Sequence, residues 1–95
     1  MRRIVWKPDA LADIDRLINF LHPKSPAAAQ RAYLAIAEAA QRLAEFPSIG
    51  RPMDDLPIGY REILIPFSSS GYRLLYLDGD PVEVLAVRHM REGQY

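Results

Sequence analysis

The hydrophobic pattern of the chain changes its period near residue 59, and this change restricts the possible folds more than any other feature. Between residues 8 and 46, apolar side chains recur three and four residues apart, which is the pattern of amphipathic helices. From residue 60 onward, short runs rich in β-branched, aromatic and aliphatic residues alternate with turn signals, which is typical of strands. The 95 residues therefore predict a single domain, residues 1–95, of the α+β class.

Two helices are predicted in the first half of the chain. Pro8 opens the first, and His22-Pro23 ends it; Ser25-Pro26 opens the second, which runs to about Phe46. The apolar stripe of the first helix comprises Leu11, Ile14, Leu17, Ile18 and Leu21, and Asp13, Asp15, Arg16 and Asn19 lie off it. The inner face of the second comprises Ala29, Ala32, Tyr33, Ile36, Ala40 and Leu43. The short link between the helices predicts an antiparallel hairpin.

Three strands are predicted after the loop from Pro47 to Pro57. They run from Tyr60 to Phe67, from Tyr72 to Leu77 and from Val82 to Arg88, with hairpin loops at 68–71 and 78–81. A first strand at 3–6 adds to one edge, and the sequence does not decide which edge. The expected fold is β-α-α-β-β-β, with an antiparallel helical hairpin packed on a mainly antiparallel four-stranded sheet.

The composition and the motifs exclude several functional classes. Twelve basic residues balance twelve acidic ones, which argues against a general binder of polyanions. Cysteine is absent, the two histidines lie in different elements, and no cofactor-binding or catalytic signature occurs, so we expect no cofactor and no metal. No segment resembles a signal peptide or is long enough to span a membrane, so we expect a cytoplasmic protein.

Arginines at the strand ends form the one candidate site. Alternation places Val82, Val84, Ala86 and Arg88 on one side of the last strand, and Glu83, Leu85, Val87 and His89 on the other. Arg61, Arg73 and Arg88 each end an alternating apolar set, and matched registers would bring them together with His89, Arg91 and Tyr95. The alternative is that these arginines are ordinary surface groups, in which case Arg61 or Arg91 would pair with Glu62, Glu92 or the Asp54-Asp55 loop.

The chain resembles the RelE/ParE toxin superfamily in the order and spacing of its motifs. Nearly the whole length takes part, through Trp6-x-Pro8-x-Ala10, Leu43-x-x-Phe46-Pro47-x-x-Gly50-Arg51-Pro52, Gly59-x-Arg61-Glu62, Tyr72-Arg73-Leu74-Leu75-Tyr76 and Val87-Arg88-His89-x-Arg91-Glu92. The resemblance implies a type II toxin that forms a hetero-oligomer with a cognate antitoxin, and that does not by itself bind DNA sequence-specifically.

The superfamily has two main activities, and the chain looks more like its ParE branch, which inhibits DNA gyrase by binding. Met53 stands where some ribonuclease members carry a glutamate, and the ending Val-Arg-His-x-Arg-Glu is similar to that of ParE-like members. The target-binding residues implied are Arg61, Arg73, Arg88, His89 and Arg91. The first alternative is a RelE-like, metal-independent mRNA interferase that acts on the ribosome. Its catalytic set would be Arg61, Arg73, His89, Glu92 and Tyr95. A second alternative is a protein-binding domain of the same fold without toxicity.

Overall fold

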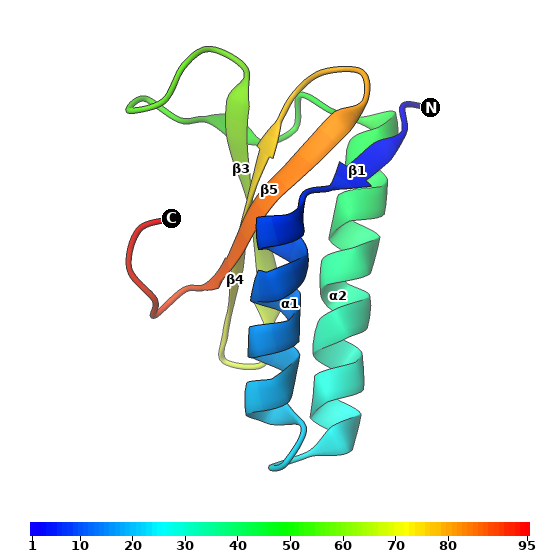
Figure 1. Cartoon of the computed structure of the whole chain (residues 1–95), viewed down its shortest axis with the longest axis vertical. Coiled ribbons are helices and arrows are strands. Elements are labelled where there is room, and N and C mark those ends of the chain that lie inside the picture. Colours follow the sequence, from blue (N-terminus) through cyan, green and yellow to red (C-terminus); the bar gives the residue numbers. More distant parts are fainter.

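The computed structural model describes residues 1–95 and has two helices packed on a five-stranded sheet (Figure 1). In chain order the elements are β1 (Ile4–Trp6), α1 (Pro8–Leu21), α2 (Pro26–Glu45), β2 (Arg51–Pro52), β3 (Tyr60–Phe67), β4 (Ser70–Leu77) and β5 (Val82–His89). The predicted α+β class and the helical hairpin on one sheet face are confirmed. No helix is both long enough and apolar enough to cross a membrane.

The sheet has the strand order β1-β5-β4-β3-β2, which settles the position of the first strand. Strand β1 pairs in parallel with β5, Ile4 lying opposite Val82, and the other neighbouring strands are antiparallel. The expected count of four strands is wrong because β2 adds a fifth at the far edge. Its two residues, Arg51 and Pro52, are too few to show an alternating pattern, so periodicity cannot detect them.

The helical hairpin forms where capping and apolar spacing direct it. The Ser25 hydroxyl accepts a hydrogen bond from the Ala28 N–H at 3.1 Å, and Pro26 follows it at the first helical position. In Figure 1, α1 and α2 stand side by side on one side of the sheet. The core between them and the sheet includes the fully buried Ile36 and Leu43.

Two helix residues that were expected in the core are exposed instead. Leu11 is 50% exposed and Tyr33 is 52% exposed, because the apolar stripes of the two helices are wider than the sheet face they cover. Both side chains line a groove of about 530 Å³ on the outer side of the hairpin, which Ile4 and Trp6 of β1 also line. We refer to this as the outer groove.

A bulge in β5 changes which residues face the helices. Tyr76 lies opposite Val84, whereas Leu75 lies opposite Ala86, so Leu85 is an extra residue in the strand. The expected grouping of Ala86 with Val82 and Val84 is therefore wrong. After the bulge Val87 packs into the core beside these two valines, while Ala86 turns to the face that the helices leave open.

Candidate functional site

The structure separates the three strand-end arginines into two places. Arg73 and Arg88 lie opposite each other in the β4–β5 register, on the open face of the sheet. Arg61 is paired in register with Tyr76, whose ring is buried in the helix-side core. The Arg61 guanidinium donates to the Gly50 carbonyl at 2.8 Å, and its Nε lies 3.3 Å from Oδ2 of Asp78. The predicted convergence is thus correct for Arg73 and Arg88 and wrong for Arg61.

A buried carboxylate, that of Glu62, organises the open face. This residue is only 2% exposed, and its Oε1 accepts hydrogen bonds from Arg51 Nε at 3.0 Å and Nη2 at 2.9 Å. Arg73 Nη1 lies 3.8 Å from its Oε2. Pairing of Glu62 with Arg61 or Arg91, which the sequence left open, does not occur. The neighbouring β2 strand and the pleat of β3 direct Glu62 towards Arg51 and Arg73 instead.

The end of the chain folds back over this carboxylate. The Tyr95 hydroxyl donates to Glu62 Oε2 at 2.7 Å, and Arg73 Nη2 donates to the carbonyls of Gly93 at 2.5 Å and Glu92 at 3.2 Å. The Arg73 guanidinium also lies 5.0 Å from the centre of the Tyr95 ring. Burial, and then the nearby Glu62 carboxylate, raise the pKa of Tyr95 above its ordinary value, so the phenol stays a hydrogen-bond donor. We call Glu62, Arg73 and Tyr95 the tail clasp.

Arg88, the other arginine of the open face, is held by a residue that the helical pattern had placed off the core. Asp13 of α1 is 9% exposed, and its Oδ2 accepts the Val87 N–H at 2.9 Å and pairs with Arg88 Nη1 at 2.5 Å. Strand β1 covers only the first three residues of β5, so the Val87 N–H would otherwise lie on an unpaired strand edge. The role of Asp13 can therefore be recognised only when the pairing of β1 with β5 is known.

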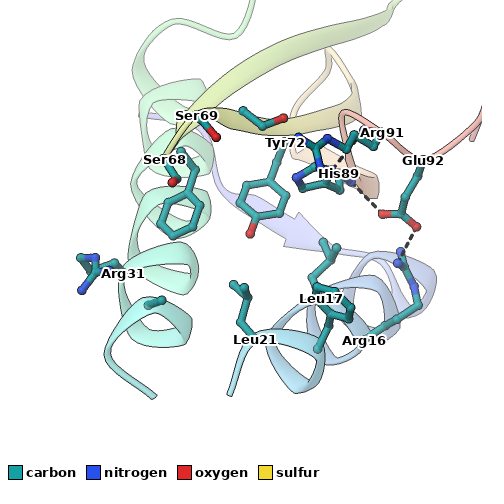
Figure 2. A pocket seen from close by; sticks show the side chains of 14 residues that line it. Arg16, Leu17, Leu21, Arg31, Ser68, Ser69, Tyr72, His89, Arg91 and Glu92 are labelled. Carbon is teal, nitrogen blue, oxygen red and sulfur yellow. Dashed lines mark hydrogen bonds and ion pairs between the residues drawn. The ribbon is translucent and has the colours of Figure 1, made fainter. Parts of the chain in front are cut away.

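His89 lies on the opposite side of the sheet from Arg73 and Arg88. Its ring meets Tyr72 edge to face with 5.6 Å between centroids, and its Nδ1 accepts the Arg91 N–H at 3.1 Å. Both rings line a groove of about 700 Å³ between the end of α1, the start of α2 and the turn that joins β3 to β4 (Figure 2). We call this the hairpin groove.

Glu92 closes one end of the hairpin groove. Its Oε1 accepts the His89 N–H at 2.7 Å, and its Oε2 accepts from Arg16 Nη1 at 2.6 Å, as the dashed lines in Figure 2 show. Burial alone would raise the pKa of Glu92, but the hydrogen bond from His89 and the Arg16 guanidinium together lower it below its ordinary value. Glu92 is therefore a structural anion at the base of the tail.

The residues suggested for acid–base chemistry do not form one site. Arg73 and Tyr95 meet over the open face, whereas His89 and the Glu92 carboxylate border the hairpin groove. The residues that sequence reasoning missed are Glu62 as the centre of the open face and Arg51 as its partner. The chain has no group of three or more His, Cys, Asp or Glu side chains placed to hold a metal ion.

Comparisons with known proteins find a family model named ParE and curated relatives named RelE. The model of the ParE toxin of the type II toxin–antitoxin system parDE matches residues 4–93. Toxin RelE3 of Caulobacter vibrioides is 31% identical over 93 residues, covering 97% of this chain and 98% of that protein. Toxin RelE1 of the same organism is 38% identical over 81 residues, 84% of each chain. A solved structure described as the chromosomal ParDE TA system from P. aeruginosa aligns with a TM-score of 0.71. It is 19% identical and covers 94% of this chain and 96% of its own, which supports the shared fold.

Proposed function

The chain belongs to the ParE toxin family of type II toxin–antitoxin systems, and on that premise we propose that it inhibits DNA gyrase by binding, without catalysing a reaction. A cognate antitoxin neutralises it in a hetero-oligomeric complex. The residues proposed to contact the target are Arg73 and Arg88 on the open face, Arg61 at the edge near β2, and His89 and Arg91 at the base of the tail.

The single observation that carries this proposal is the separation of His89 from Arg73 by the sheet. Cleavage of a phosphodiester bond needs a cation on the phosphate and a proton-transferring group within hydrogen-bond reach of the same reacting atoms. Tyr72 and Arg73 are consecutive on β4, and His89 contacts Tyr72 on the helix side, while Arg73 faces the open side. One bound phosphate cannot reach both groups.

The ion pairs of the open face and its margins also favour binding of a protein over cleavage of RNA. Arg51 is paired with Glu62, Arg61 with Asp78, and Arg88 with Asp13, while Arg73 is occupied by the tail carbonyls. A surface that grips RNA phosphates gains from uncompensated cations, and here the net charge of the chain is zero. These arginines are better suited to directional contacts with a protein partner.

A ribosome-dependent ribonuclease remains the second candidate, because one carboxylate–guanidinium–phenol set does exist on the open face. Glu62 would have to act as the base, with Arg51 and Arg73 on the phosphate and Tyr95 as a hydrogen-bond donor. This set differs from the one expected from sequence, since it omits His89. In the structure Glu62 already accepts from both Arg51 and Tyr95, and substrate would have to displace the tail.

Purified toxin added in parallel to gyrase supercoiling reactions and to translating ribosomes tests the proposal. We expect loss of supercoiling, uncut mRNA and nearly unchanged inhibition by His89→Gln. Removal of the tail from Arg88 onward should reduce the inhibition, because several contacts disappear together. Codon-specific mRNA cleavage with normal supercoiling would overturn the proposal. Loss of that cleavage in the Glu62→Gln variant would then identify the ribonuclease site. Normal bacterial growth during expression of the folded toxin would instead support a non-toxic binding domain.

The antitoxin part of the proposal has a separate test. Co-expression with the product of the neighbouring gene should restore growth and yield a complex that co-purifies. If none of the adjacent open reading frames restores growth, the chain does not work as half of a toxin–antitoxin pair.

A further inference from the structure

The hairpin groove has the lining of a binding site for an apolar group. Its floor is formed by Leu17 and Leu21 of α1, Phe67 at the end of β3 and Tyr72 of β4. The volume of about 700 Å³ falls within the range of pockets that bury a substantial side chain or a small ligand. Only Ser68 and Ser69 separate β3 from β4, because Phe67 already pairs with Ser70, so this turn forms a short wall beside the floor.

One polar group inside this groove lacks a partner. Tyr72 as a residue is only 2% exposed, and its hydroxyl lies in the groove without a hydrogen bond to any group of the chain. Figure 2 shows the hydroxyl directed into the space above Leu17 and Leu21. The oxygen is not one of the fully buried unpaired atoms of the chain, so solvent can reach it through the groove. A ligand that accepts a hydrogen bond from it therefore finds a donor already in position. Burial raises the pKa of this phenol, which keeps it a donor.

The rim of the groove carries positive charge that the chain does not neutralise. Arg31 of α2 and Arg91 of the tail both line the groove, and neither forms an ion pair. Arg16, on the opposite side from Arg31 in Figure 2, is paired with Glu92, whose two oxygens are both already occupied. The groove thus combines an apolar floor, a phenol donor and two cations that have no acidic partner.

We propose that the hairpin groove receives an anchor of the antitoxin, namely an aromatic or branched apolar side chain with a carboxylate within one helical turn of it. The apolar side chain would fill the space between Leu21 and Phe67. The carboxylate would then accept from Tyr72 or pair with Arg31 or Arg91. This inference rests on the proposed function only in requiring an antitoxin, and it does not depend on gyrase being the target.

A matched pair of substitutions on α2 tests the site. Ala28 lines the hairpin groove and Ala37 lines the outer groove, and both are half-buried. Ala28→Trp should fill the hairpin groove and weaken antitoxin binding by about 30-fold or more, the loss expected when a central anchor is excluded. Ala37→Trp should change the dissociation constant by less than about 3-fold. Circular dichroism and thermal unfolding establish that each variant folds.

Finer substitutions test the chemistry of the anchor. Tyr72→Phe should weaken the complex by about 3- to 10-fold, the loss of a single hydrogen bond. Joint replacement of Arg31 and Arg91 by Gln should flatten the dependence of the dissociation constant on salt. A photo-crosslinking amino acid at Ser69 should attach to an antitoxin residue that lies next to an apolar side chain and within four positions of Asp or Glu.

The outcomes separate this proposal from its rivals. Wild-type affinity in Ala28→Trp, or a greater loss in Ala37→Trp, would overturn it. So would concentration-dependent self-association of the free toxin abolished by both Ala28→Trp and Ile58→Asp. Ile58 is a fully exposed apolar side chain that lies close in sequence to Asp54 and Asp55, so it resembles the anchor proposed for the groove. Loss of self-association in both variants would therefore identify a second copy of this chain as the occupant. If gyrase supercoiling is unaffected while Ala28→Trp still abolishes antitoxin binding, the proposed target fails and the groove assignment stands.

Discussion

Replacement of Tyr95 by Phe tests whether the end of the chain is held on the open face. The change removes one oxygen atom and leaves the ring beside Arg73. The lost hydrogen bond is 2.7 Å long, and its acceptor is the 2% exposed carboxylate of Glu62, which also pairs with Arg51. Hydrogen bonds to charged groups contribute about 1.5–3 kcal/mol to stability.

The full loss should not be observed, because the tail can open. Once the phenol no longer holds it, the last residues can detach, and water then solvates the Glu62 oxygen that Tyr95 left. Arg51 also retains its two hydrogen bonds to the other oxygen. We therefore expect Tyr95→Phe to lower the free energy of unfolding by about 1.5 kcal/mol, at the lower end of that range. For a domain of this size the melting temperature should fall by about 6–12 °C.

Urea unfolding of four proteins measures this prediction: wild type, Tyr95→Phe, Glu62→Gln and the double variant. If the tail clasp exists in solution, the two changes are not additive, since each removes the same hydrogen bond. Hydrogen exchange should also speed up at residues 93–95 in both single variants. A loss below about 0.3 kcal/mol in Tyr95→Phe, with additive effects in the double variant, would show that Tyr95 is not bound to Glu62.

Three further predictions concern stability. Ile36→Ala, at a side chain 1% exposed, should lower the free energy of unfolding by about 2–5 kcal/mol in urea titrations, and a smaller loss would mean that the hairpin is not packed on the sheet. Asp13→Ala should cost about 2–4 kcal/mol by leaving the Val87 N–H without an acceptor and Arg88 without its carboxylate partner, and Asp15→Ala on the exposed side of the same helix is its control. The folded-state pKa of Glu92 is lowered, so its charge stabilises the fold above pH 4.5, and the advantage of wild type over Glu92→Gln should vanish as the pH falls below that value.

The sequence predicts the elements of this fold well because their signals are local. The proline and serine at the start of α2 act on the next turn of the chain, and the spacing of Ile36 and Leu43 fixes the buried face of that helix. The same reasoning misplaces Leu11 and Tyr33. Their periodicity shows that they share a stripe, but it cannot show how wide a stripe the sheet covers.

The candidate site is harder to predict because it depends on register. Glu62 meets Arg51 only because a two-residue strand pairs beside β3, and no alternating pattern announces that strand. Asp13 looks like a surface residue until β5 is found to leave its Val87 N–H unpaired at the sheet edge. In each case a buried carboxylate finds its partner more than ten residues away in the sequence. The propensities of single residues do not predict which distant residue that partner is.

The β-bulge at Leu85 explains why the end of β5 serves two surfaces. After the bulge, Arg88 points to the open face and His89 to the hairpin groove, because consecutive residues of a strand point to opposite faces. The last four residues then run from Glu92, at the groove, to Tyr95, above Glu62 on the other face. Deleting the chain from Arg88 onward therefore removes contacts on both faces together and cannot assign an effect to either one. Substitution of Phe for Tyr95 or Tyr72 separates them, since the Tyr95 hydroxyl belongs to the tail clasp on the open face and the Tyr72 hydroxyl lies in the hairpin groove. If Tyr95→Phe alone weakened gyrase inhibition and Tyr72→Phe alone weakened antitoxin binding, target and antitoxin would be assigned to opposite faces of the same sheet.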